Sequence, residues 1–134
     1  MTPPSPPPDR PAPLGCLLAL AIGFGTVAFE LGALALLTGL PLSVEGWPIH
    51  LLNALGVAFP FGLLALAGVR TRLPWAVGLV LTFALWAWFI YEGVSYQWNP
   101  DGSGANIGLG MILLASPMII ATAVFAAHAT QRLR

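Results

Sequence analysis

The sequence has very little charge. Only 7% of its 134 residues are Asp, Glu, Lys or Arg, and lysine is absent. A soluble domain carries about 25% charged residues. Because 57% of the residues are hydrophobic, so few charges cannot cover a water-facing surface of this size. This excludes an ordinary soluble domain and favours lipid as the solvent.

Cysteine and histidine are also scarce, which argues against several kinds of membrane enzyme. The single cysteine, Cys16, permits neither an internal disulfide nor the cysteine pair of quinone–thiol chemistry. The two histidines, His50 and His128, lie at opposite membrane faces, whereas membrane haem bundles use paired histidines within their helices. No His-x-x-x-His or Glu-x-x-His pattern supports a metal hydrolase. We therefore expect no enzyme, no cofactor and no bound metal.

Most of the sequence consists of long apolar stretches. A helix needs about 20 mostly apolar residues to span the hydrocarbon core of a bilayer. Four stretches meet this requirement, residues 14–40, 49–69, 73–92 and 106–127. The sequence thus predicts an all-α, polytopic membrane protein, a bundle of four transmembrane helices in a single domain over residues 14–127. We expect it in a cell membrane, a bacterial inner membrane, surrounded by lipid and without a nucleic-acid partner.

Short tails flank this domain. Residues 1–13 read MTPPSPPPDRPAP, and proline both fixes φ and removes a backbone donor, so we expect a disordered tail. Residues 128–134 form a basic tail. The first apolar stretch is longer than the apolar region of a signal peptide, which has about 7–15 residues, so we expect a retained helix.

The basic residues predict an orientation. All five are arginines, and with four spans they fall on one side of the membrane: Arg10, Arg70, Arg72, Arg132 and Arg134. Glu45, Glu92 and Asp101 fall on the other side. The positive-inside rule makes the arginine side cytoplasmic, so both termini are expected there.

The segment QWNPDGSGANIGLG, residues 97–110, is then the outer loop between the third and fourth helices. Asn99-Pro100-Asp101-Gly102 has the chemistry of a turn. The glycine spacing does not match a dinucleotide loop, and one carboxylate is too few for a calcium loop. Gly104 and Gly108 are expected to pack closely with a neighbouring helix at the start of the last span.

The first helix carries a repeated pattern of small residues. They are spaced alternately by four and three: Ala21, Gly25, Ala28, Gly32, Ala35 and Gly39. In lipid, helices associate through close backbone contact at small residues, and this spacing predicts left-handed packing. We call these six residues the seam and expect it to be a packing surface.

Glu30 is the main candidate for chemistry. It lies two residues beyond Ala28, about 200° around the helix, and so faces away from the seam. A carboxyl group at mid-membrane is costly, so such a residue is a candidate functional site. The alternative is a purely structural role, in which Glu30 is protonated and hydrogen-bonded to Thr26 or to a backbone carbonyl. A first helix packed on two opposite faces would need a partner outside the chain.

Other polar residues lie near the expected outer surface. His50, Asn53, Tyr91 and Glu92 could join Glu30 and Thr26 in an outward-opening pocket for a proton or a ligand. A weaker alternative is a metal or enzyme site at His50, Glu30 and Glu92.

Pro60 and Pro117 lie near the middle of the second and fourth spans. Each removes a donor and frees a carbonyl one turn earlier, at Gly56 and Leu113. We expect structural kinks. The alternative is that the freed carbonyls line a cavity.

The size, the four spans and Glu30 resemble the small multidrug resistance transporters, a family that couples export to protonation of such a glutamate. The chain departs from that family because it lacks the basic residue after the first helix and the glycine-rich motif of the third. The strong arginine bias also differs from members that insert in both orientations. We therefore assign no family.

Two functions follow as expectations. The first is an accessory or assembly subunit, or a homo-oligomer, that acts through helix packing at the seam. The alternative is a small proton-coupled transporter that uses Glu30.

Overall fold

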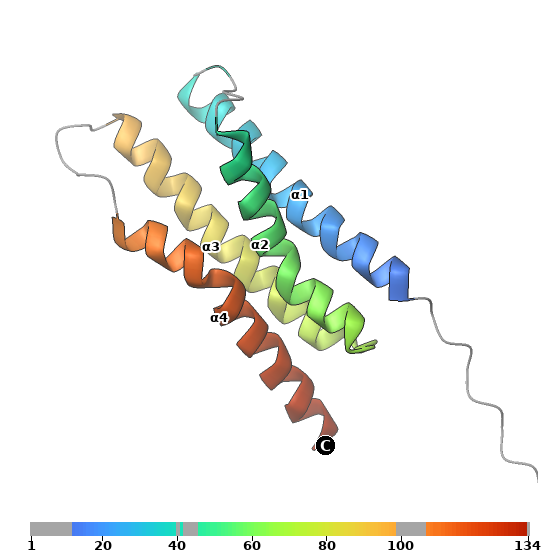
Figure 1. The fold of residues 1–134 in the computed structure, drawn as a ribbon. Helices are drawn as coiled ribbons and strands as arrows, with labels where there is room; N and C mark the ends of the chain where they lie inside the picture. The colour runs from blue at the N-terminus through green and yellow to red at the C-terminus, as the bar shows by residue number, and fades with distance from the viewer. Residues whose placement is uncertain (1–11, 40, 42–45, 99–106, 134) are drawn as a thin grey trace, which may run out of the picture.

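The computed structural model describes residues 12–39, 41, 46–98 and 107–133, except for the side chains of Ala12, Gln97, Ile107 and Leu109. This part of the chain forms four α-helices and no strand: α1 (Ala12–Thr38), α2 (Trp47–Leu66), α3 (Arg72–Trp98) and α4 (Ile107–Arg132) (Figure 1). All four are long and apolar enough to cross a membrane. The predicted all-α bundle of four membrane-spanning helices is confirmed.

Successive helices run in opposite directions, so the start of α1 and the end of α4 lie at the same end of the bundle (Figure 1). The helices α2 and α3 each contact all the others, whereas α1 contacts α2 and α3 but not α4. The bundle therefore has α2 and α3 between α1 and α4. One long face of α1 is left without a helix from the described part of the chain.

Glycine ends two of the helices. Gly68 follows α2 with φ 66°, and the amide of Val69 donates to the carbonyl of Leu64 over 3.0 Å, which is a Schellman ending. Gly39 follows α1 with φ 69°, and its amide donates to the carbonyl of Ala35 over 3.0 Å. Gly39 is thus a helix-ending residue. Its prediction as a helical packing position of the seam is wrong, because a left-handed residue breaks the helical spacing.

Two helices are longer than the sequence predicted. The helix α3 runs to Trp98 instead of residue 92, and α4 runs to Arg132 instead of residue 127. Polarity marks where an apolar run ends, but it does not end a helix. Residues 93–98 contain no proline, and neither does the start of the basic tail, so backbone hydrogen bonding continues toward the water.

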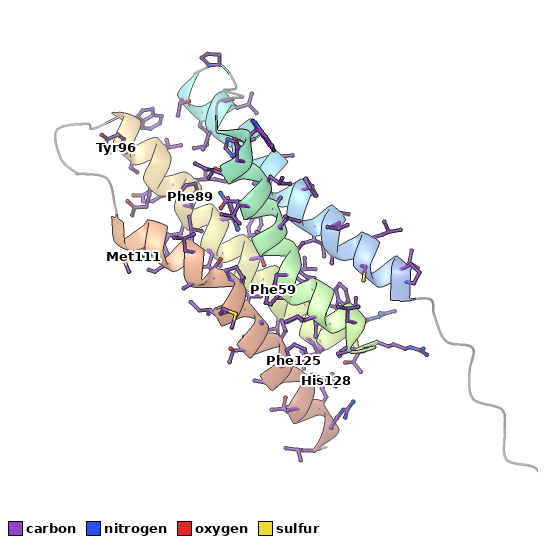
Figure 2. All side chains as sticks on the ribbon, in the orientation of Figure 1. Phe59, Phe89, Tyr96, Met111, Phe125 and His128 are labelled. Atoms are coloured by element: carbon purple, nitrogen blue, oxygen red, sulfur yellow. The ribbon has the colours of Figure 1, made fainter. Side chains whose placement is uncertain are left out.

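Two buried clusters hold the helices together. One joins Val27 of α1, Ala54 and Val57 of α2, and Trp86 of α3. The other is formed by Leu64, Val69, Ile120 and Val124. Large apolar side chains also project from the outside of the bundle, for example Leu36 and Leu114, which are 87% and 72% exposed (Figure 2). An apolar exterior is what a lipid-facing surface requires.

Candidate functional site

Glu30 is buried in the bundle. Its side chain is only 5% exposed, and its oxygen Oε2 has no hydrogen-bond partner among the described residues. The expected bond with Thr26 is not found, because the Thr26 hydroxyl donates to the carbonyl of Ile22 over 2.8 Å. Glu30 is thus an intramembrane carboxyl group with an unsatisfied oxygen, the arrangement that makes such residues candidates for function.

The face of α1 that carries Glu30 packs against α2 through small residues. Gly23 lies against the carbonyl oxygen of Ala54, and a β-carbon at Gly23 would stand 3.0 Å from Cβ of Ala58. A β-carbon at Gly15 would stand 2.7 Å from Cβ of Ala65. Sequence reasoning missed this contact, although the spacing of four in Gly15, Ala19 and Gly23 is itself a small-xxx-small pattern.

The opposite face of α1 is the seam, and it is open. A β-carbon added at Gly25 or at Gly32 would meet no atom within 4 Å. Ala21 and Ala28 are exposed, and Ala35 is half-buried. The seam is therefore open at Gly25 and Gly32 in the described part of the chain.

The other predicted polar residues do not gather around Glu30 into a three-ligand site. Among the described residues, no group of three His, Cys, Asp or Glu side chains is placed to hold a metal ion, so His50, Glu30 and Glu92 do not form one. Tyr91 is 68% exposed. Glu92 accepts a hydrogen bond of 3.2 Å from Nε1 of Trp88 on its own helix. His50 and Asn53 are half-buried near the start of α2, and Nδ1 of His50 lacks a partner among the described residues.

The surroundings of Pro60 and Pro117 bear on whether these prolines have a structural role. Pro60 is buried within α2, which continues on both sides of it. In α4 the hydroxyl of Ser116 donates to the carbonyl of Leu113 over 2.7 Å, so the carbonyl that Pro117 frees is satisfied. A β-carbon at Gly56 would lie 3.3 Å from Cγ of Pro117, so the proline ring packs where α2 has no side chain. This favours the structural role for Pro117.

The two ends of the bundle differ in their side chains. Arg70, Arg72 and Arg132 are exposed at one end, where Nε1 of Trp75 donates to the carbonyl of Val69 over 3.1 Å. Exposed aromatic residues lie toward the other end: Trp47, Tyr91, Tyr96 and Trp98. Figure 2 shows Tyr96 and His128 toward these opposite ends. Arg10, Glu45, Asp101, Gly104 and Arg134 lie outside the described residues, and Gly108 is exposed in the first turn of α4.

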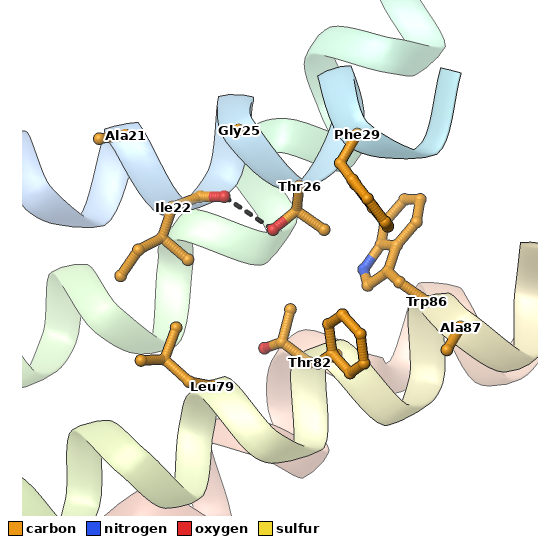
Figure 3. A pocket seen from close by; sticks show the side chains of 10 residues that line it. Ala21, Ile22, Gly25, Thr26, Phe29, Leu79, Thr82, Trp86 and Ala87 are labelled. Atoms are coloured by element: carbon orange, nitrogen blue, oxygen red, sulfur yellow. Dashed lines mark hydrogen bonds between the residues drawn. The ribbon is translucent and has the colours of Figure 1, made fainter. Parts of the chain in front are cut away.

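A groove of about 380 Å³ separates α1 from α3. Its α1 wall contains Ile22, Thr26 and Phe29, and its α3 wall contains Leu79, Thr82 and Trp86 (Figure 3). Ala21 and Gly25 of the seam also line it. Nothing in the sequence pattern predicted this feature, because most of its residues are ordinary for a membrane helix.

Comparisons of the chain with protein-family models, with curated proteins and with solved structures give no match.

Proposed function

We propose that the protein is a small integral membrane protein that acts through packing of α1, either as an accessory or assembly subunit or as a homo-oligomer. One observation carries this proposal: the small residues of the seam are at helical spacing but open, with nothing within 4 Å of a β-carbon at Gly25 or Gly32.

The contrast within α1 supports the proposal. At Gly23 the small residue allows backbone contact with α2, whereas at Gly25 and Gly32 the space beyond the glycine is free. Glycine in a helix interior costs about 1 kcal/mol relative to alanine. That cost is recovered where a second helix approaches the glycine closely, and the described part of the chain supplies no such helix at Gly25 or Gly32.

The proposed setting is a cell membrane, with both termini in the cytoplasm. The exposed Arg70, Arg72 and Arg132 lie at one end of the bundle, and cytoplasmic loops carry an excess of arginine and lysine. A partner would reach the seam from within the bilayer, because the seam residues from Ala21 to Ala35 belong to the candidate membrane span of α1.

The alternative function is a proton-coupled transporter, and the observation that favours it is the burial of Glu30 with an unpartnered Oε2. A buried carboxyl group that gains and loses a proton is the usual carrier in such proteins. The carbonyl of Leu113 already accepts a hydrogen bond from Ser116, so it is not a free polar group that could line a transport path.

The first test is extraction from the native membrane with a mild detergent, followed by native mass measurement and identification of the proteins that remain bound. We expect a stoichiometric foreign subunit or a defined homo-oligomer. A single copy that remains alone in lipid nanodiscs as well as in detergent would overturn the packing proposal and favour the transporter.

Cysteine cross-linking tests whether the seam is the contact. In a Cys16→Ser background, Gly32→Cys is expected to give an oxidised dimer in a homo-oligomer, or a cross-link to the partner subunit after addition of a bifunctional thiol reagent. Leu114→Cys, at an exposed position of α4, is the matched control and is expected to give neither. Equal cross-linking at both positions would indicate random collision in the membrane.

A further inference from the structure

Thr82 differs from the other membrane threonines of the described chain. The hydroxyls of Thr26, Thr38, Thr122 and Thr130 each donate to a carbonyl three or four residues earlier in their own helix. Thr82 is only 3% exposed, and its Oγ1 has no hydrogen-bond partner among the described residues. Its hydroxyl therefore lacks the bond that ordinarily satisfies a threonine in a membrane helix.

Trp86, one turn further along α3, also has a buried polar group that lacks a hydrogen-bond partner among the described residues. Its side chain is 5% exposed, and Nε1 has no partner among the described residues. The indole nitrogen only donates, so it needs an acceptor. An unsatisfied buried donor costs about 1–3 kcal/mol, and lipid cannot supply the missing bond.

Both groups belong to one groove. Thr82 and Trp86 are four residues apart and so lie on one face of α3, in the wall toward α1 (Figure 3). Both lie near the middle of the α3 span. At that depth the groove is open to the hydrocarbon part of the bilayer and not to water.

The rest of the groove is apolar and reachable from lipid. Phe29 and Phe83 are 59% and 66% exposed, and their rings stand 6.5 Å apart across the two helices. Ala21 and Ala87 also line the groove, and their small side chains leave its opening unobstructed. A volume of about 380 Å³ falls within the range of small-molecule sites, about 300–1,000 Å³.

We propose that the groove between α1 and α3 binds a lipid-soluble molecule with an apolar body and a carbonyl oxygen. Since Oγ1 of Thr82 and Nε1 of Trp86 are themselves buried, the two side chains turn toward the ligand to donate hydrogen bonds to that oxygen. A carbonyl oxygen has two lone pairs and can serve both donors. The aromatic pair Phe29 and Phe83 packs against the apolar body. The ligand enters sideways from the bilayer, where such molecules concentrate.

Two other occupants fit less well. A plain acyl chain fills the volume but leaves both donors unsatisfied. A transmembrane helix with its side chains is about 10–12 Å wide, which is too wide for this volume. Ala21 and Gly25 belong both to the groove and to the seam, so a helix packed on the seam would border the bound ligand.

The test uses the full chain in lipid nanodiscs with an alkylated benzophenone as the probe. Its ketone is both the acceptor and, on irradiation, the group that inserts into nearby C–H bonds. We expect saturable labelling that maps to the peptides of α1 and α3 that line the groove. A long-chain dialkyl ketone should compete for the site, and an alkane of the same length should not.

Variants separate the two donors from the shape of the groove. The double variant Thr82→Val with Trp86→Phe should weaken probe binding about thirtyfold, the contribution of two ordinary hydrogen bonds. Thr122→Val and Trp88→Phe are the matched controls, since these groups are exposed and already bonded within their own helices, and they should bind as the parent chain does. Ala87→Leu, at an exposed rim position, should reduce labelling by obstruction without disturbing the fold.

Three results would overturn the proposal: labelling spread evenly over the bundle, competition by the alkane as strong as by the ketone, or unchanged binding in the double variant. If the double variant does not fold, retained binding in Ala87→Leu would overturn it instead.

Discussion

Gly23 of α1 lies against the carbonyl oxygen of Ala54 in α2, so that a β-carbon at Gly23 would overlap that oxygen. Two residues further along, a β-carbon at Gly25 would meet no atom within 4 Å. These two glycines of one helix therefore have opposite surroundings, and the difference identifies which face of α1 the chain uses for its own fold.

The first prediction compares the two glycines. Gly23→Ala should destabilise the folded chain by about 1–3 kcal/mol, because the added methyl group forces α1 away from α2. Gly25→Ala should leave the fold intact or stabilise it slightly, because alanine is the better helix former. Reversible unfolding in mixed micelles, followed by tryptophan fluorescence, measures both. Equal destabilisation by the two changes would contradict the α1–α2 contact.

The second prediction concerns the seam. Gly25→Leu with Gly32→Leu should reduce association with a second copy or a partner at least tenfold, because leucine side chains prevent close backbone approach. Helicity and stability of the single chain should not change, since the space beside both glycines is free. Energy transfer between labelled chains in nanodiscs gives the association. Association that persists undiminished would show that the seam faces lipid only.

The third prediction concerns Ser116 and Pro117. Ser116→Ala should destabilise the chain by about 1 kcal/mol, because the carbonyl of Leu113 loses its donor. In a Pro117→Ala background this cost should fall toward zero, since the amide of residue 117 then donates to the same carbonyl. Additive effects in this double-mutant cycle would show that the Ser116 hydroxyl does not compensate for the proline.

The fourth prediction tests the transporter alternative at Glu30. If Glu30 carries a proton, Glu30→Gln should abolish proton flux across proteoliposomes, because the amide keeps the shape but cannot exchange a proton. A pH-sensitive dye trapped inside the vesicles reports the flux. Thr122→Val, which changes an exposed polar side chain already bonded within its own helix, serves as the control. Flux that survives Glu30→Gln unchanged would remove Glu30 from that role.

The fifth prediction is the orientation. A reporter that is active only outside the cytoplasm should be silent when fused after Arg134 and active when fused within residues 99–106. The reason is the placement of the five arginines: one before α1, two between the end of α2 and the first residue of α3, and two at or after the last residue of α4. The reverse pattern of activity would place the termini outside.

The number and type of helices followed from the sequence alone. A bilayer requires about 20 apolar residues for each span, and the chain has four such runs with few charges elsewhere. The burial of Glu30 was also predictable, because a carboxyl group within an apolar run avoids lipid by facing other helices. Gly39 was misplaced although a signal was present, since a glycine followed closely by Pro41 is typical of a helix end.

Only the tertiary structure decided which face of α1 meets α2. Both faces carry small residues at helical spacing, and spacing does not rank them, whereas contact with Ala54 and Ala58 does. The groove likewise depends on the distance between α1 and α3, which no residue pattern specifies. Thr82 and Trp86 are unremarkable in the sequence. They become unusual only because the fold buries a hydroxyl and an indole N–H in one wall, with no acceptor for either among the residues that the structure describes.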